Sequence, residues 1–217
     1  MTELARYLEH TLLKPEATVA DIIKICGEAK ENQLRAVCVN PCYVALAGHL
    51  LSGTGVKVVT VIGFPLGATY PEVKELETKM AVANHADEID MVMNISAFKT
   101  GDYQAVEDEI KRVVTAAKPR QVKVIIETAL LTDEEKRKAC QLVIAGGAKF
   151  VKTSTGFAKN GATVSDLRLI KEEIAGSGLG IKAAGGIRDA ATAKAMLEAG
   201  ATRIGTSVGN LIAAEDV

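Results

Sequence analysis

The feature of this chain that most limits its possible folds is a regular alternation of short β-branched runs with amphipathic helical stretches. Eight such runs follow one another about 28 residues apart, which is the length of one βα unit. Strands that alternate strictly with helices form a parallel sheet. We therefore predict parallel strands at residues 7–10, 36–39, 57–62, 88–93, 122–126, 149–152, 180–183 and 203–205.

Eight parallel strands can close into a barrel or remain an open doubly wound sheet. The barrel is favoured because none of the eight runs has the polar character of a protected edge strand. A length of 217 residues is enough for one complete barrel but short for two domains. No linker or low-complexity stretch interrupts the alternation. We predict a single (β/α)8 domain, a TIM barrel, over residues 1–217.

Two of the predicted helices carry further signals. Thr132 followed by Glu135 is the pattern of a capping box at a helix start. An earlier helix has an apolar stripe at helical spacing, which we expect to face the sheet, with Glu75 and Lys79 paired on the solvent side. The stripe consists of Val73, Leu76, Met80 and Ala83.

Charge and composition exclude several classes of function. The chain has 26 basic and 27 acidic residues, a net charge of -1, and no basic stripe. We therefore expect neither nucleic acid nor a membrane surface as a partner. The start of the chain lacks a signal-peptide pattern, and no apolar run approaches the roughly 20 residues that span a bilayer. We expect a cytoplasmic protein whose four cysteines are reduced and mostly buried.

Three ionisable residues fall within predicted strands, where burial is expected: Asp90, Lys152 and Lys182. Successive strand residues point to opposite faces. Because Ile89 and Met91 should face the helices, Asp90 should face the barrel interior. The same alternation places Lys152 and Lys182 inside the barrel.

Buried lysines are either paired or used in chemistry. One interpretation is a structural ion pair between Asp90 and one lysine, which leaves the second lysine unexplained. The functional interpretation is Schiff-base chemistry, which needs a neutral amine. Lowering a lysine pKa from about 10.4 to about 7 requires roughly 4 kcal/mol. A second ammonium about 6 Å away supplies roughly 3 kcal/mol at an effective dielectric near 20, and burial supplies the rest.

Glycine-rich loops follow the last three predicted strands, at residues 153–156, 183–188 and 205–209. Glycine lets backbone N–H groups approach an anion closely. Each loop alone is weak evidence because a tight βα turn also needs glycine. Barrels commonly bind phosphate after strands seven and eight, however. Three such loops beside two lysines predict a phosphate site.

These stretches resemble the deoxyribose-phosphate aldolase family, and the similarity runs over essentially the whole chain. It is carried by the motifs HTLLKP (10–15), VCVNP (37–41), VIGFP (61–65), EIDMV (88–92), VKTSTGF (151–157) and KAAGGIR (182–188). The family joins acetaldehyde and glyceraldehyde 3-phosphate reversibly into 2-deoxyribose 5-phosphate, without a metal. The resemblance implies the same reaction here, with no cofactor.

The resemblance also implies roles for individual residues. Lys152 would form the Schiff base, Lys182 would lower its pKa and take part in proton transfer, and Asp90 would move protons through a water. The phosphate would be met by Gly156, Gly185, Gly186 and Ser207, with Arg188 nearby. Family members commonly form dimers or higher assemblies, so we expect a homodimer or homotetramer.

The chain departs from the family pattern in several places. Glu9 stands where Asp is common, which would change polar contacts around the sugar hydroxyl. Ala129 replaces a frequent Gly, Asn160 interrupts a Gly pair, and Val208 replaces a second Ser. The tyrosine-bearing tail of longer relatives is also missing. We expect these differences to affect substrate affinity more than the type of reaction.

Two other functions remain open from the residues alone. A phosphosugar isomerase would use a lysine and Glu127 as a proton shuttle on the same barrel. A non-enzymatic barrel would bind a phosphosugar for regulation. Glu127, at the end of its strand, is expected either to orient a lysine or to bind substrate. The family resemblance implies that His10 lies near the mouth of the barrel, and a hydrogen-bonded structural role for it is equally open.

Overall fold

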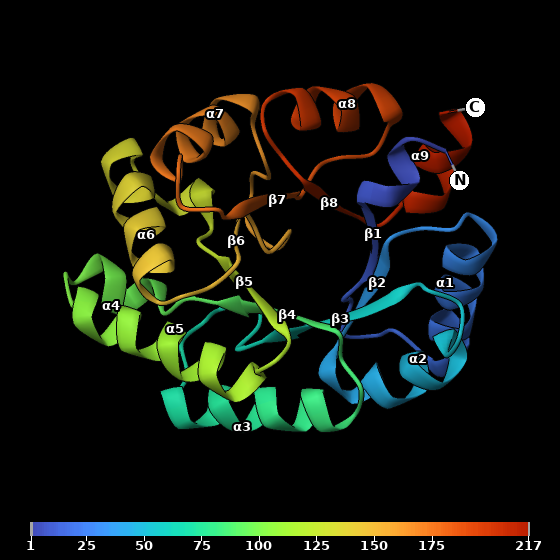
Figure 1. The fold of residues 1–217 in the computed structure, drawn as a ribbon, viewed down its shortest axis with the longest axis horizontal. Helices are drawn as coiled ribbons and strands as arrows, with labels where there is room; N and C mark the ends of the chain where they lie inside the picture. Colours follow the sequence, from blue (N-terminus) through green and yellow to red (C-terminus); the bar gives the residue numbers. More distant parts are fainter. Residues whose placement is uncertain (1, 217) are drawn as a thin grey trace.

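The computed structural model describes residues 2–216, so both ends of the predicted 1–217 domain lie outside it. In this range the parallel strands form a closed barrel in chain order, and β8 pairs with β1. Figure 1 shows the strands at the centre with the helices around them, which confirms the (β/α)8 prediction. The strands are β1 (Leu8–Leu12), β2 (Ala36–Val39), β3 (Lys57–Ile62), β4 (Glu88–Val92), β5 (Gln121–Ile125), β6 (Phe150–Lys152), β7 (Gly180–Ala184) and β8 (Arg203–Thr206).

Helices connect the strands and cover the outside of the barrel. They are α1 (Val19–Glu31), α2 (Val44–Leu51), α3 (Pro71–Ala83), α4 (Ile95–Lys99), α5 (Tyr103–Ala117), α6 (Asp133–Ala145), α7 (Val164–Glu173), α8 (Ala190–Glu198) and α9 (Gly209–Glu215). Short 3-10 helices are present at Leu4–Tyr7, Pro41–Tyr43 and Thr128–Leu130. The predicted capping box is present at the start of α6, between Thr132 and Glu135.

The first strand differs most from its predicted position. Residues 7–10 were expected, but β1 runs from Leu8 to Leu12, because the chain before it forms a 3-10 helix that ends at Tyr7. The other strand ends agree with the prediction to within one residue. These small shifts leave the side-chain alternation of every predicted strand unchanged.

The alternation separates two packing layers. Ile89 and Met91 belong to the large core between the barrel and its helices, as predicted, and so does Met93. A smaller apolar cluster from β2, β3 and the loop after β1 lies apart from that core. Its buried members are Leu13, Ala36, Cys38, Val59 and Val61. The remaining inward positions of β4 to β7 are free for polar side chains.

The predicted orientation of α3 is wrong. Its apolar stripe is exposed, with Leu76 at 58% and Met80 at 57%, and the helix instead buries Lys74. The Nζ of Lys74 donates to the Val92 carbonyl at 2.8 Å and to Glu109 of α5 at 2.7 Å. A buried ion pair that also caps a strand carbonyl therefore sets the rotation of this helix.

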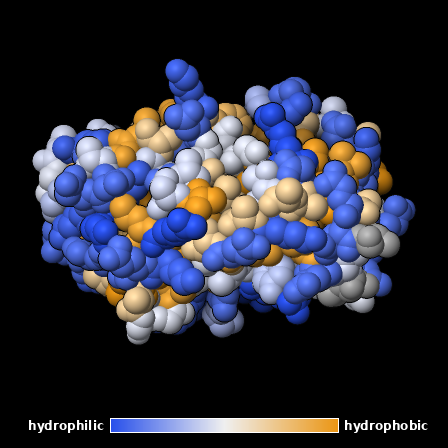
Figure 2. Space-filling view, turned by 90° about the horizontal axis from the view of Figure 1, so that it is seen from above, coloured by the Kyte–Doolittle hydropathy of each residue, from blue (hydrophilic) through white to orange (hydrophobic). Residues whose placement is uncertain are grey.

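The surface shown in Figure 2 is largely hydrophilic, and the cysteines are free thiols that are mostly buried, as the sequence predicts. On the side of α7 and α8, seen in Figure 2, hydrophilic residues cover most of the surface and apolar residues appear between them. No helix within residues 2–216 is long and apolar enough to cross a membrane. All four cysteines are free thiols, and only Cys42 is exposed.

Candidate active site

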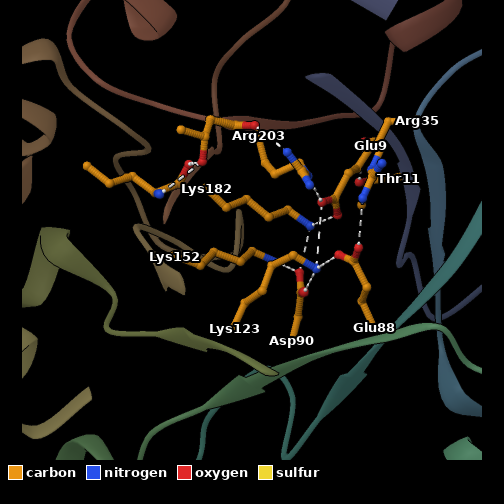
Figure 3. A network of polar contacts seen from close by, with 11 residues as sticks. Glu9, Thr11, Arg35, Glu88, Asp90, Lys123, Lys152, Lys182 and Arg203 are labelled. Carbon is orange, nitrogen blue, oxygen red and sulfur yellow. Dashed lines mark hydrogen bonds and ion pairs between the residues drawn. The ribbon is translucent and has the colours of Figure 1, made fainter. Parts of the chain in front are cut away.

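The barrel interior contains a cluster of buried ionisable side chains that point toward one another (Figure 3). They come from β1, β4, β5, β6 and β7, which brings distant parts of the chain together. The cluster consists of three lysines and three carboxylates: Lys123, Lys152, Lys182, Glu9, Glu88 and Asp90. The strand register explains part of this meeting, since Lys152 is the register partner of Lys182 and Asp90 that of Lys123.

Asp90 lies at the centre of the cluster. Its Oδ2 accepts from the Nζ of Lys152 at 2.8 Å and from the Nζ of Lys182 at 2.6 Å. Its Oδ1 accepts from Lys123 at 3.1 Å. Burial alone would raise the pKa of Asp90, but the three ammonium groups outweigh burial and hold that pKa well below its usual range. Asp90 is therefore an anion that links the two predicted catalytic lysines.

Lys182 has two carboxylate partners, Asp90 and Glu9. Burial alone would lower the pKa of Lys182, but the two carboxylates outweigh it and raise this pKa above its ordinary value. Lys182 is consequently a permanent cation at neutral pH. Glu9 is fully buried and faces Lys182 and, at 3.6 Å, Lys123. It therefore belongs to the buried ion cluster, whereas the resemblance led us to expect an effect on contacts to the sugar hydroxyl.

Lys123 connects the cluster to the opposite end of the barrel. Its Nζ lies 2.5 Å from Glu88, which also pairs with Arg35 at 3.3 Å. Burial alone would lower the pKa of Lys123, but Asp90 and Glu9 raise it above the ordinary value. The guanidinium of Arg203 lies 3.9 Å from Glu9. The ion cluster thus fills the interior below Asp90 with cations and carboxylates in mutual contact.

A cavity of about 300 Å³ opens above the cluster at the carboxyl ends of the strands. Its lining contains Lys152, and it also contains all five residues predicted to meet the phosphate: Gly156, Gly185, Gly186, Arg188 and Ser207. Gly185 and Gly186 have φ angles of 85° and 82°, a left-handed backbone that favours glycine. Lys152 is the member of the buried cluster that reaches this cavity.

Glu127 lies two residues beyond the end of β5 and has a left-handed backbone with φ 54°. Its carboxylate accepts from the backbone N–H of Thr155 at 3.2 Å and from the Thr155 hydroxyl. Across residues 2–216, no lysine Nζ lies within ion-pair distance of this carboxylate. Glu127 therefore holds the loop after β6, rather than orienting a lysine as one of our two expectations had it.

No group of three or more His, Cys, Asp or Glu side chains in the described part of the chain is arranged to hold a metal ion. The site therefore consists of the lysine–carboxylate cluster and the cavity above it. A lysine that lines a cavity of about 300 Å³ and is linked through a carboxylate to a second lysine is suited to covalent chemistry on a carbonyl compound.

Comparison with known proteins assigns the family. Residues 6–213 match the profile described as DeoC/LacD family aldolase. The chain belongs to this family. Two relatives named deoxyribose-phosphate aldolase are those of Streptococcus uberis, 55% identical over 95% of this chain and 94% of the relative, and Enterococcus faecalis, 57% identical over the same shares.

Solved structures agree with this membership. The aldolase described as QR15 is 44% identical, with a TM-score of 0.95 over 99% of this chain and 96% of its own. The deoxyribose phosphate aldolase of Aeropyrum pernix, whose structure is described as a unique tetramer, is 34% identical, with a TM-score of 0.92 over 97% of this chain and 89% of its own. The resemblance to the deoxyribose-phosphate aldolase family seen in the sequence motifs is thereby confirmed, and the chain is a lyase.

The structure of this aldolase brings together the three residues predicted as catalytic, but one step of the prediction was incomplete. That step treated Asp90 as the single carboxylate available to two lysines. The interior of this barrel instead has three lysines and three carboxylates, and Lys182 is shared between Asp90 and Glu9. The environment of Lys152 therefore depends on the whole cluster.

Lys123 and Glu88 are the members of the cluster whose part in the site the sequence reasoning missed. A usable signal was present, because Lys123 lies between Val122 and Val124, both of which pack toward the helices. Alternation alone would have placed Lys123 inside the barrel of this aldolase. Glu88 shares a face with Asp90 in the same way.

Proposed function

We propose that this aldolase reversibly cleaves 2-deoxy-D-ribose 5-phosphate into acetaldehyde and D-glyceraldehyde 3-phosphate through a Schiff base on Lys152. The observation that carries the proposal is the position of Lys152. Its amine contacts Asp90 within the buried cluster, and its side chain lines the cavity with the five predicted phosphate residues. The relatives named deoxyribose-phosphate aldolase support this choice of substrate.

In this mechanism the neutral amine of Lys152 attacks C1 of the open-chain sugar. The resulting carbinolamine loses water and leaves an iminium ion. Removal of the proton from the C3 hydroxyl then breaks the C2–C3 bond, which releases glyceraldehyde 3-phosphate, while the electron pair forms an enamine on Lys152. Protonation of the enamine at C2 and hydrolysis return the free amine and acetaldehyde.

In these steps Asp90 moves protons and Lys182 supplies positive charge. Asp90 contacts both lysines through one oxygen, so it is placed to pass a proton, directly or through a water, to or from the nitrogen of Lys152. The lasting positive charge of Lys182 disfavours a second ammonium beside it. That repulsion favours the neutral, nucleophilic form of Lys152.

The phosphate would lie at the opposite end of the cavity from Lys152. Gly156, Gly185 and Gly186 present backbone without side chains, Ser207 presents a hydroxyl, and Arg188 presents a guanidinium. Charge-assisted hydrogen bonds of this kind hold phosphate oxygens and fix the orientation of the sugar. The carbonyl carbon would then face the amine of Lys152.

Cleavage of 2-deoxyribose 5-phosphate in the presence of a chelator tests the proposal. Acetaldehyde is measured by its reduction with NADH and alcohol dehydrogenase added to the assay. We expect turnover that EDTA leaves unchanged and that is lost in Lys152→Met. Absence of acetaldehyde release by the wild-type protein would refute the proposed substrate. An isomerase would instead give an isomeric sugar phosphate without release of acetaldehyde; in the structure one oxygen of its second proton-transfer group, Glu127, accepts from Thr155 and the other has no partner.

We further propose that the aldolase is a homodimer or homotetramer without nucleic-acid or membrane partners. The exposed stripe of α3, with Leu76 and Met80 more than half exposed, supplies an apolar surface that a second copy would cover. The tetrameric relative supports this assembly. Light scattering should give at least twice the mass of one chain for the wild type, and a smaller mass for Leu76→Lys combined with Met80→Lys. A monomeric wild-type protein would contradict the proposal.

A further inference from the structure

His10, which the proposed reaction does not use, lies buried in β1 between two elements of the active-site face. Its Nε2 is 2.8 Å from a carboxylate oxygen of Glu28 in α1. Its Nδ1 accepts from the backbone N–H of Gly209 at 3.3 Å. The ring packs closely on that backbone, since a Cβ added at Gly209 would meet its Nδ1 at 3.4 Å. The imidazole is 3% exposed and both its nitrogens have partners.

The partners determine the form of the ring. A backbone N–H can only donate, so the Nδ1 of His10 must be unprotonated where it accepts from Gly209. The remaining hydrogen is then on Nε2 and points to Glu28. Glu28 therefore fixes the tautomer of His10, because the hydrogen bond made by one ring nitrogen determines which nitrogen carries the proton. Lys24 lies 4.0 Å from the other oxygen of Glu28 and adds a weak, exposed contact.

The segment that His10 holds is the turn after β8, which carries Ser207. On one side of Ser207, the Thr206 hydroxyl donates to the Ile187 carbonyl at 2.7 Å and accepts from the Val208 N–H at 3.2 Å. On the other side, Gly209 is tied to His10. Ser207 itself is exposed and lines the cavity that contains Lys152. The turn therefore presents Ser207 from between two anchor points.

We propose that the His10–Glu28 pair positions the Ser207 turn for the substrate phosphate and so sets the preference for phosphorylated over unphosphorylated sugar. This inference rests on the proposed function. His10 acts here as a positioning residue, because it does not line the Lys152 cavity and contacts the turn through its backbone. Loss of this anchor would weaken phosphate binding and leave the chemistry at Lys152 unchanged.

Three variants separate this role from general stability. His10→Leu removes both hydrogen bonds. His10→Asn keeps an acceptor at the position of Nδ1 but cannot reach Glu28, and His49→Asn, on the surface of α2, is the control. For each, kcat and KM are measured with 2-deoxyribose 5-phosphate and with 2-deoxyribose, and folding is checked by urea unfolding.

We expect His10→Leu to raise KM for the phosphorylated sugar about fivefold or more, the worth of one lost hydrogen bond, with little change in kcat. Its KM for 2-deoxyribose should stay unchanged. His10→Asn should recover most of the difference, and His49→Asn should match the wild type. The inference would be overturned if His10→Leu left the ratio of kcat/KM for the two sugars unchanged, whether neither value falls or both fall equally.

The wild-type protein distinguishes this failure from failure of the proposed function. If the wild type cleaves both sugars equally well, the assigned phosphate site is wrong and the role of His10 falls with it. If the wild type strongly prefers the phosphorylated sugar and His10→Leu keeps that preference, only the role of His10 is wrong.

Discussion

Replacement of Lys182 by Met tests the electrostatic account of the site. Lys152 and Lys182 bind the same oxygen of Asp90, at 2.8 and 2.6 Å, so their ammonium groups would lie about 5 Å apart. At an effective dielectric near 20, two unit charges at that separation repel by roughly 3 kcal/mol. The substitution removes this repulsion. It also frees Asp90 and Glu9 to attract the remaining lysines more strongly.

Both effects favour the protonated form of Lys152 in the variant. A change of roughly 3 kcal/mol corresponds to about a hundredfold change in the ratio of the neutral to the protonated amine. We therefore expect kcat at pH 7 to fall at least about a hundredfold. Because an amine loses its proton in alkaline solution, we also expect part of the activity of the variant to return as the pH is raised.

The assay measures the release of acetaldehyde between pH 6 and pH 10. This range runs approximately from the ordinary pKa of a histidine side chain to that of a lysine side chain. Lys149→Met is the matched control, because Lys149 is exposed beside β6 and should leave the curve unchanged. Circular dichroism and urea unfolding establish that both variants are folded. Near wild-type activity of Lys182→Met at pH 7, or a pH–rate curve that stays in place, would refute the reasoning.

The remaining predictions concern stability and the thiols. Lys74→Met leaves Glu109 buried without its cation and should lower the free energy of unfolding by about 3–5 kcal/mol. The control Lys79→Met, at an exposed ion pair, should lower it by less than about 0.5 kcal/mol. Equal losses for the two variants in urea unfolding would contradict this prediction. Because the pKa of Asp90 is lowered, its stabilising contribution should be complete above about pH 4 and lost on further acidification, so Asp90→Asn should flatten acid unfolding there. A thiol reagent at pH 8 should label Cys42 alone in the folded protein, since burial raises the pKa of the other cysteines to about 11 or 12; labelling of a second cysteine would count against the structure.

Much of the barrel and the centre of the site could be predicted because both depend on local patterns. The period of two in the strands fixes which side chains face inward, and this was enough to place Asp90, Lys152 and Lys182 in one interior. The glycine-rich loops predicted the residues that surround the cavity. These inferences need only the strand positions and the rule that parallel strands end at the same edge.

The missing parts depend on contacts between distant segments. Which carboxylate meets which lysine is set by the stagger of strands around the barrel, so the link between Glu9 of β1 and Lys182 of β7 has no local signal. The predicted rotation of α3 about its axis was wrong for a similar reason. Its hydrophobic pattern was read as a core-facing stripe, but the pair formed by Lys74 and Glu109 of α5 decides which face is buried.

Borohydride trapping tests the central claim, the Schiff base on Lys152, most directly. The protein is incubated with acetaldehyde and sodium borohydride, digested, and its peptides are weighed by mass spectrometry. We predict loss of activity together with one added ethyl group on the peptide that contains Lys152, and no such label in Lys152→Met. A label confined to other lysines, or activity that survives the treatment without any label, would contradict the account.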